Sequence, residues 1–404
     1  MQKRKILAGI AVGVSMTAAT ALAQQMPSMS AAGSAASGAT GFPVGPLTVY
    51  PGVNLAAGHD DNLFYSNVNQ RGSSFTVLSP YIRAEAKPGP HKFDLTLQVD
   101  DGRYYNSTAD NYTDYGLIGR GDIVFSGRAG LKLRAEARHG HDPRGSTDRG
   151  VSGSPDEYNN AGVDGIFAYG APGAQGRIEV DAGYYKRDYT NNRVFTAASD
   201  RSSSQLGGTF YWRVMPRTEL LFQAQERWIN YDLATSTQDS TETRLYVGAK
   251  WEATAATTGY VKFGQLRKDF KTAGQAGESF GSWDLGVRWS PLTYSVVDLL
   301  SSKQTNESTG VGDAIVTSLY SATWTHAWNS RLRSQVLARY QTDDFAGNGA
   351  TRQDDTTAFG LRMDYDFRRW LKFSGAYTYT TRNSNVNTVE YNRNLWLFTV
   401  GATL

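Results

Sequence analysis

Apolar and polar residues alternate along most of the chain after residue 47. In AGLKLRAEAR, residues 129–138, Ala or Leu occupies every odd position, while Lys, Arg or Glu occupies most even positions. Side chains of a β-strand point alternately to opposite faces, so this stretch predicts a strand with one apolar and one polar face. The same alternation recurs in 176–185, 244–252, 282–290 and 371–380. Helical spacing of apolar residues is scarce, so we expect no substantial helix there.

The connections between these stretches alternate between two lengths. Eight are short turns, such as PGP at 88–90, and nine are long polar loops, such as 60–73, 141–156 and 304–313. Short turns on one side and long loops on the other are typical of outer-membrane barrels. We therefore predict an all-β fold over residues 47–404, a transmembrane antiparallel up-and-down β-barrel of about eighteen strands. About sixteen strands remain the alternative if the hairpin at 292–327 is misread.

The composition by itself would favour a polar soluble protein, with 40% hydrophobic residues, 20% charged residues, a mean hydropathy of −0.45 and no cysteine. A membrane barrel accounts for these values, because lipid covers the outward apolar face and the closed sheet pairs its own backbone groups. The alternative is a soluble β-sandwich or propeller, but the two-strand period and the alternating loop lengths favour the barrel. Tryptophans near the short turns fit a membrane interface. They are Trp212, Trp251, Trp289, Trp324, Trp328 and Trp370.

The N-terminus has the pattern of an export signal. Residues 1–23 combine a basic head, a short apolar run and a small-residue cleavage site, as a cleaved secretory signal peptide does. Residues 24–46 are rich in Ala, Ser, Gly and Pro and predict a flexible lead-in. Export and a membrane barrel together predict the outer membrane of a Gram-negative cell. Three of the 41 basic residues lie in the signal peptide, so the remaining ones match the 38 acidic residues and nucleic-acid binding gains no support.

The first predicted strand ends in a distinctive run, VNLAAGHDDNLFYS at 53–66. An alternating strand followed by Asp61, Asn62, Leu63 and Phe64 resembles the opening of the putative β-barrel porin 2 family. The resemblance implies an outer-membrane barrel that passes polysaccharide or other polar solutes, since the family includes proteins from exopolysaccharide biosynthesis and export loci. It also implies a glycan and periplasmic polysaccharide-export components as partners, beside membrane lipid and lipopolysaccharide.

The chain ends on a strand with one apolar face. Every second position is apolar: Trp396, Phe398, Val400, Ala402 and Leu404. We expect this face to contact lipid and the strand to pair with the first strand, because an unpaired edge in a bilayer is costly. The pattern resembles the C-terminal signal that the barrel-assembly machinery reads, although Leu404 stands where an aromatic residue is usual.

Charged residues on the polar faces are expected to line a lumen. Barrels of this size can hold an aqueous channel, and its charges bias the solutes that pass. The proposed pore-lining residues are Lys132, Arg134, Glu136, Arg138, Glu179, Asp181, Arg244, Lys250, Asp284, Arg288, Arg331, Arg333, Arg339, Arg362, Asp364, Asp366, Lys372 and Arg382. Basic positions outnumber acidic ones in this set, which favours a weak anion preference. The alternative is that the charges pair across strands and only keep the wall polar.

The predicted function is passage of polar solutes, with exopolysaccharide export as the specific hypothesis. The alternative is an occluded barrel that acts as a surface anchor or assembly partner. His59 and the sequence HGHD at 139–142 raise the question of a metal or an outer-rim hydrolase. No nucleophile or phosphate-binding motif accompanies them, so we expect no enzyme activity and no cofactor. Tyr104, Tyr185 and Tyr246 fall on inward faces, where they could stack against sugars or fill the interior.

Overall fold

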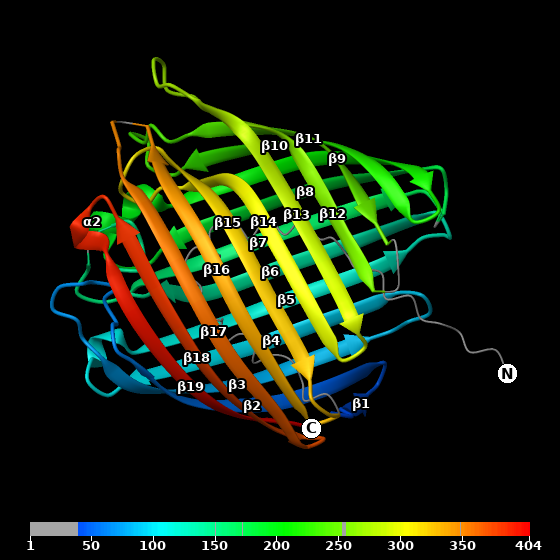
Figure 1. Cartoon of the computed structure of the whole chain (residues 1–404), viewed down its shortest axis with the longest axis horizontal. Coiled ribbons are helices and arrows are strands. Elements are labelled where there is room, and N and C mark those ends of the chain that lie inside the picture. The colour runs from blue at the N-terminus through cyan, green and yellow to red at the C-terminus, as the bar shows by residue number, and fades with distance from the viewer. Residues whose placement is uncertain (1–38, 150, 172, 253–255, 348) are drawn as a thin grey trace.

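Nineteen β-strands form one antiparallel sheet, and eighteen of them close into a barrel (Figure 1). This computed structural model describes residues 39–149, 151–171, 173–252, 256–347 and 349–404. The ring closes where β19 pairs with β2, from Leu395↔Asp60 to Thr403↔Gly52. The barrel strands are β2 (Leu47–Asp60), β3 (Ser73–Ala86), β4 (Lys92–Tyr104), β5 (Tyr112–Val124), β6 (Ala129–Asp142), β7 (Asp156–Tyr169), β8 (Gly176–Tyr189), β9 (Arg201–Met215), β10 (Thr218–Tyr231), β11 (Ser240–Trp251), β12 (Thr257–Phe270), β13 (Glu278–Leu292), β14 (Ser295–Glu307), β15 (Ala314–Ala327), β16 (Leu332–Ala346), β17 (Gln353–Arg368), β18 (Leu371–Ser384) and β19 (Tyr391–Thr403).

The eighteen-strand barrel predicted from the alternation is confirmed, because the hairpin in doubt forms β14 and β15 of the ring. One further strand, β1 (Phe42–Val44), lies within the segment expected to be a flexible lead-in. It pairs with the start of β2 and turns at Gly45, whose φ of +58° glycine adopts without steric cost. The predicted signal peptide and residues 24–38 lie outside the described residues.

Helical structure in the described chain is confined to short pieces in the long loops. α2 (Arg193–Thr196) has four residues, and 3₁₀ turns occupy Thr108–Asp110, Ala197–Ser199 and Asn387–Val389. These pieces contribute nothing to the barrel wall. Among the described residues, no helix has the length and apolar character needed to cross a membrane.

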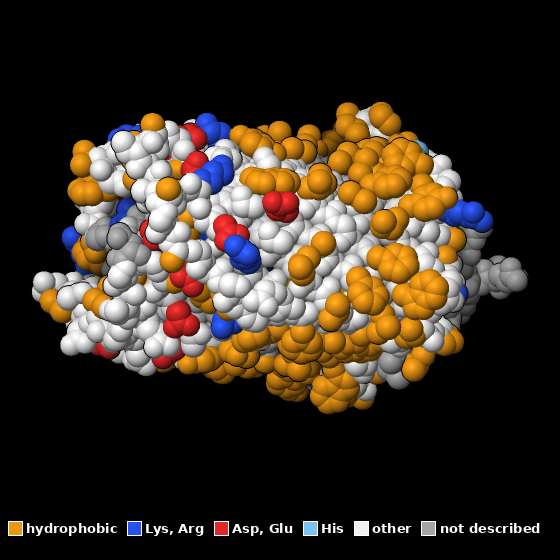
Figure 2. Space-filling view, turned by 90° about the horizontal axis from the view of Figure 1, so that it is seen from above, with side chains coloured by type: hydrophobic (Ala, Val, Ile, Leu, Met, Phe, Trp, Pro, Cys, Tyr) orange, Lys and Arg blue, Asp and Glu red, His pale blue; other side chains and the backbone are white. Residues whose placement is uncertain are grey.

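The outward faces of the strands carry the apolar half of the alternation. Leu245, Val247 and Phe263 lie on the adjacent strands β11 and β12, and each is more than half exposed. Figure 2 shows hydrophobic side chains gathered over the middle and right of the barrel, whereas the left end, where Figure 1 places α2, is mostly polar. Exposed apolar area of this extent fits a lipid-facing surface. Five of the exposed tryptophans lie near the short turns: Trp212, Trp289, Trp324, Trp328 and Trp370.

The ladder of pairs between β13 and β14 stops before the two strands end. The pairs run from Leu292↔Ser295 to Asp284↔Ser302, whereas β13 continues to Glu278 and β14 continues to Glu307. Residues 303–318 comprise the end of β14, its loop and the start of β15, and we call them the inner hairpin. Polar residues 304–313 were expected to form an outer loop, and this expectation is wrong for the part in β14.

The inner hairpin packs against the inner side of the barrel wall. The Glu307 carboxylate accepts hydrogen bonds from Lys268 Nζ at 2.6 Å and from Tyr231 OH at 2.8 Å. Thr305 Oγ1 donates to the Glu242 carboxylate. Tyr231, Glu242 and Lys268 belong to β10, β11 and β12, and their buried positions alternate with exposed ones on the outer face. The side chains of Glu242, Lys268 and Glu307 have no solvent-exposed area. At this point the inner hairpin therefore forms a second layer that packs on the wall strands.

Candidate functional site: the barrel lumen

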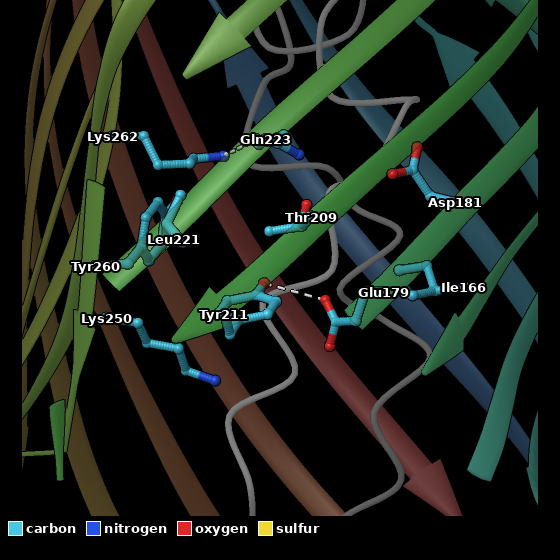
Figure 3. A pocket seen from close by; sticks show the side chains of 10 residues that line it. All are labelled: Ile166, Glu179, Asp181, Thr209, Tyr211, Leu221, Gln223, Lys250, Tyr260 and Lys262. Atoms are coloured by element: carbon cyan, nitrogen blue, oxygen red, sulfur yellow. Dashed lines mark hydrogen bonds between the residues drawn. The ribbon is translucent and has the colours of Figure 1, made fainter. Parts of the chain in front are cut away.

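A depression in the inner wall collects the polar faces of neighbouring strands (Figure 3). Strand β8 contributes Glu179 and Asp181, while β11 and β12 contribute Lys250 and Lys262. The remaining lining residues are Ile166, Thr209, Tyr211, Leu221, Gln223 and Tyr260. Neighbouring strands lie about 4.8 Å apart, so the acids on β8 and the lysine on β11 are separated by about 14 Å of wall. The uncharged side chains of β9 and β10 fill the space between the two charged sides.

Hydrogen bonds hold the acidic side of this depression in place. Asp181 Oδ2 accepts from Gln225 Nε2 at 3.0 Å and from Gln205 Nε2 at 3.2 Å. Glu179 Oε2 accepts from Tyr211 OH at 3.0 Å, the contact drawn in Figure 3, and Arg177 donates to Oε1. Donors on two other strands, β9 and β10, together with Arg177 on β8 itself, therefore fix the two carboxylates on this side of the lumen.

The basic side of the depression is less constrained. Lys262 Nζ lies 2.6 Å from Asp284 Oδ2 and 3.3 Å from Gln223 Oε1. Lys250 has no ion pair within 4.0 Å to any described residue, and Figure 3 shows its ammonium reaching into the depression. An ammonium on a flexible stem can contact a solute that passes along the wall. The depression thus presents fixed negative charge opposite mobile positive charge.

The predicted pore-lining residues lie on the inward faces of their strands, except Arg331, which precedes β16 in a short turn. Most of them pair with a neighbouring charge: Arg134–Glu136, Arg138–Asp114, Arg177–Glu179, Arg244–Glu242, Lys262–Asp284, Arg288–Asp298, Arg362–Asp364, Lys372–Asp364 and Arg382–Asp354. Several of these partners are acids outside the predicted set, so its basic excess does not extend to the whole inner face. A role of the set in conduction stays a prediction.

The inward aromatics contact the wall. Tyr104 packs on Phe75 with ring centroids 5.2 Å apart, and Tyr246 OH lies 2.6 Å from Ser282 Oγ. These contacts favour the filling of the interior as the role of Tyr104 and Tyr246. Tyr185 also belongs to the inward face, on β8.

The long loops narrow the outer end of the barrel. Asp148, in the β6–β7 loop, accepts hydrogen bonds from the backbone N–H groups of Thr309, Gly310 and Val311 at 2.9–3.1 Å. This contact joins the loop to the tip of the inner hairpin. Nearby, residues from β8, β9, β16, β17 and β18 line a single cavity of about 110 Å³. Strands β9 and β18 lie on opposite sides of the eighteen-strand ring, so the loops reach across the mouth.

Sequence reasoning missed the residues that build this mouth. Arg187 and Arg201 lie at inward-facing positions of β8 and β9, so the alternation along these strands could have predicted that they face the lumen. Asp148 and Glu307 lie in or beside polar segments that have the composition of solvated loops. Nothing local in those segments indicates that they fold inward, because their partners lie on distant strands.

The family motif fastens the first strand to the last. Asn394 donates to both Asp61 oxygens at 2.7 Å, and Asn62 Nδ2 donates to the Asn392 carbonyl at 2.8 Å. Leu63 is buried. Phe64 lies under a guanidinium group of the β6–β7 loop at 4.3 Å. Just before the motif, Asp60 and Arg393 form a buried ion pair, and burial raises the pKa of the following Tyr65 to about 12.

The C-terminal residues face outward at the same seam. Trp396 and Phe398 are more than half exposed, as expected for a face in contact with lipid. Val400 and Ala402 share this side of β19 by alternation. Leu404 N donates to the Pro51 carbonyl at 3.1 Å, so pairing continues to the final residue. A role as an assembly signal stays a prediction.

The structure does not bring the histidine clusters together. His59 lies on β2 and bonds Ser74, whereas His139 and His141 lie on β6, with β3, β4 and β5 between. His139 bonds Asn159, and His141 Nδ1 lies 2.8 Å from Asp114 Oδ1. Within the described residues, no group of three or more His, Asp and Glu side chains is placed to hold a metal ion.

A closed antiparallel ring with an apolar exterior, a polar interior and long loops at one end defines an outer-membrane porin-like barrel. The chain belongs to the family described as putative β-barrel porin 2, which matches residues 35–403. The resemblance seen in Asp61, Asn62, Leu63 and Phe64 is thereby confirmed. The comparison with curated proteins gives no match.

Solved outer-membrane proteins share the fold. OpdK from Pseudomonas aeruginosa aligns with a TM-score of 0.51 at 10% identity, over 88% of this chain and 99% of OpdK. A structure of OpdK with vanillate gives a TM-score of 0.50 at 12% identity over the same shares. The FrpB iron transporter from Neisseria meningitidis gives 0.46 at 12% identity over 85% of this chain, which spans only 62% of that transporter. At these identities the likeness to OpdK shows the fold alone.

Proposed function

We propose that the chain is a porin-like channel for small polar solutes, and that the wall depression sets its selectivity. The separation of Glu179 and Asp181 from Lys250 and Lys262 by the uncharged lining side chains of β9 and β10 is the observation that carries this proposal. Opposite charges on two sides of one depression create a field across it. A dipolar solute, such as a zwitterion of amino-acid size, gains by orienting in that field, whereas a simple anion or cation is attracted by one side and repelled by the other.

The proposal names small polar solutes and not a polymer, because exopolysaccharide export gains no support from the comparisons.

Reversal potentials across planar bilayers test the selectivity. In a salt gradient we expect a value near zero for the native protein. Replacing Lys250 and Lys262 by Met removes the positive side, so we expect a shift towards cations. Lys271→Met, at an exposed outer loop, is the matched control and should leave the potential unchanged. A strong ion preference of the native protein, or equal effects of the lumen and control variants, would contradict the proposal.

An occluded barrel that serves as a surface anchor or assembly partner is the second candidate. The loops that reach across the mouth favour it. Conductance separates the two candidates, because an occluded barrel inserts into the bilayer without passing current.

A further inference from the structure

We propose that the inner hairpin, residues 303–318, is a movable gate that opens the lumen by pairing with the free edge of β13. The proposal rests on the proposed channel function and adds the element that would control it. In the structure the hairpin lies inside the wall, where it narrows the mouth. In the open state the upper part of β14 would return to the wall and complete its ladder with β13.

The free edge of β13 is the first observation. Residues 278–283 continue the strand for six positions above Asp284, yet none of them pairs with β14. Side-chain contacts lie along this seam: Trp283 Nε1 donates to Ser301 Oγ at 2.8 Å, and Ser282 Oγ donates to the Lys303 carbonyl. The Lys303 ammonium also lies over the rings of Phe280 and Trp283, at 5.2 and 5.9 Å. They leave most of the backbone groups on this edge without a strand partner. A free edge in a membrane wall is costly, so pairing it stabilises the open arrangement.

The register between the strands is the second observation. Continuing the pairs that run to Asp284↔Ser302 would place Thr305 opposite Gly281 and Glu307 opposite Ser279. On β14, Thr305 and Glu307 have the same parity as Leu299, which is exposed on the outer face lower in the strand. The face of the hairpin now pressed against the inner wall is therefore the face that would point outward after pairing. The upper part of β14 can therefore pass from the closed to the open state by sliding along the inner side of the wall, and it does not have to turn its faces over.

The chemistry of the packed layer is the third observation. Around Glu307, the contacts are made by Lys268, Tyr231, Thr305 and Glu242, which are ionic or hydroxyl groups. If the hairpin moved out, the charges of Lys268 and Glu242 would line a wet lumen, where water replaces the lost partner. An apolar layer would lose its stabilisation on wetting. The contacts made by Glu307 and Thr305 thus suit an element that leaves and returns, although opening would also wet Ile229 and Leu266, which are fully buried on the same faces of β10 and β12.

The tip of the hairpin is held mainly by one carboxylate. Three consecutive backbone N–H groups, at Thr309, Gly310 and Val311, converge on the Asp148 carboxylate, and the Ser308 hydroxyl donates to it at 2.9 Å. Gln238 Nε2 adds a contact to the Gly312 carbonyl at 3.4 Å. On its other side the hairpin stays in the ladder between β15 and β16, so these two strands would follow the movement of β14. Apart from that ladder, only side chains of two loops hold the tip, and they can release it without separating a sheet contact.

Disulfide trapping tests this gate, and the chain has no native cysteine to interfere. Gly281→Cys with Thr305→Cys is the test pair, because opposed strand positions satisfy disulfide geometry only when the register continues. Open space surrounds the Cβ position at Gly281. Val287→Cys with Leu299→Cys, which are opposed in the structure, is the positive control. Asp148→Cys with Thr309→Cys should hold the closed state. Each protein is oxidised in outer membranes, analysed by gel mobility and then measured in planar bilayers.

We expect the test pair to cross-link and to raise conductance at least several-fold, with reversal by reductant, and the Asp148–Thr309 pair to lower it. A test pair that stays reduced while the control pair cross-links would overturn the proposal. Equal conductance of the cross-linked and reduced test pair, with a conducting native protein, would overturn the gate and leave the channel standing. Absence of current from every variant, including the cross-linked test pair, would overturn the channel as well.

Discussion

Replacing Asp60 by Asn should loosen the closure of the barrel. Asp60 is 1% exposed, and both of its oxygens contact the Arg393 guanidinium at 2.5–3.0 Å. The substitution keeps the shape but leaves a buried guanidinium without its counter-charge. Removing one partner of a buried pair costs about 3–5 kcal/mol. At the lower end, the ratio of folded to unfolded protein falls about 100-fold.

The exposed pair Asp101–Arg103 provides the control, because its side chains are 32% and 51% exposed. Solvent screens such a pair, so Asp101→Asn should cost at most about 1 kcal/mol. Urea unfolding in detergent micelles, followed by the slower migration of the unfolded barrel on unheated gels, measures both variants. The double variant Asp60→Leu with Arg393→Met removes both charges and should recover much of the lost stability.

Equal unfolding midpoints for Asp60→Asn and Asp101→Asn would refute this reasoning. So would a double variant less stable than Asp60→Asn alone. Either result would mean that the ion pair does not hold the seam between β2 and β19, and that backbone pairing alone closes the ring.

Three further predictions concern the gate, the assembly signal and the wall. Glu307→Gln removes a buried charge-assisted hydrogen bond of about 1.5–3 kcal/mol, so the fraction of time spent open in single-channel records should rise about tenfold or more; an unchanged fraction would contradict the gate. Three aspartates added after Leu404 should reduce the amount of barrel in outer membranes, because the last strand faces lipid; normal insertion would show that the terminus is not read this way. Gly264→Ala would drive its Cβ into the Leu245 carbonyl and should lower the urea midpoint, whereas Gly208→Ala has room; similar midpoints would argue against this close approach.

The alternation of apolar and polar residues was enough to predict most of the barrel, because one face of each strand contacts lipid and the other faces the lumen. Residues 129–138 show the period without interruption, and lipid and lumen enforce it at every position of β6. The alternation of short turns with long loops then fixed the order of antiparallel neighbours. The apolar face of the last strand predicted that it pairs with the first, whereas the DDNLF run supported only the family, and its contacts with β19 at Asp61 could not be derived from local pattern.

The mouth could not be predicted in this way. Glu307 and Asp148 lie in segments whose polarity suits water, and they are buried by partners far away in the chain. Polar groups compensated by long-range partners look, in sequence, like solvated ones. The same limit affected the anion preference, since Asp114 and Asp354, which pair with predicted basic residues, were not in the predicted set.

The interrupted ladder between β13 and β14 gives the two ends of the barrel different mechanical properties. Below Asp284, hydrogen bonds run around the wall as a closed circuit, so the number of strands fixes the circumference. Above it the circuit is open, and the upper part of β14 overlaps the inner faces of β10, β11 and β12. Under the proposed gate, β14 would slide past this overlap once the backbone N–H groups of Thr309, Gly310 and Val311 leave Asp148, while the ladders within each margin stay paired. The strand number therefore sets the bore at the short-turn end, whereas at the long-loop end the proposed gate would give the barrel two different bores.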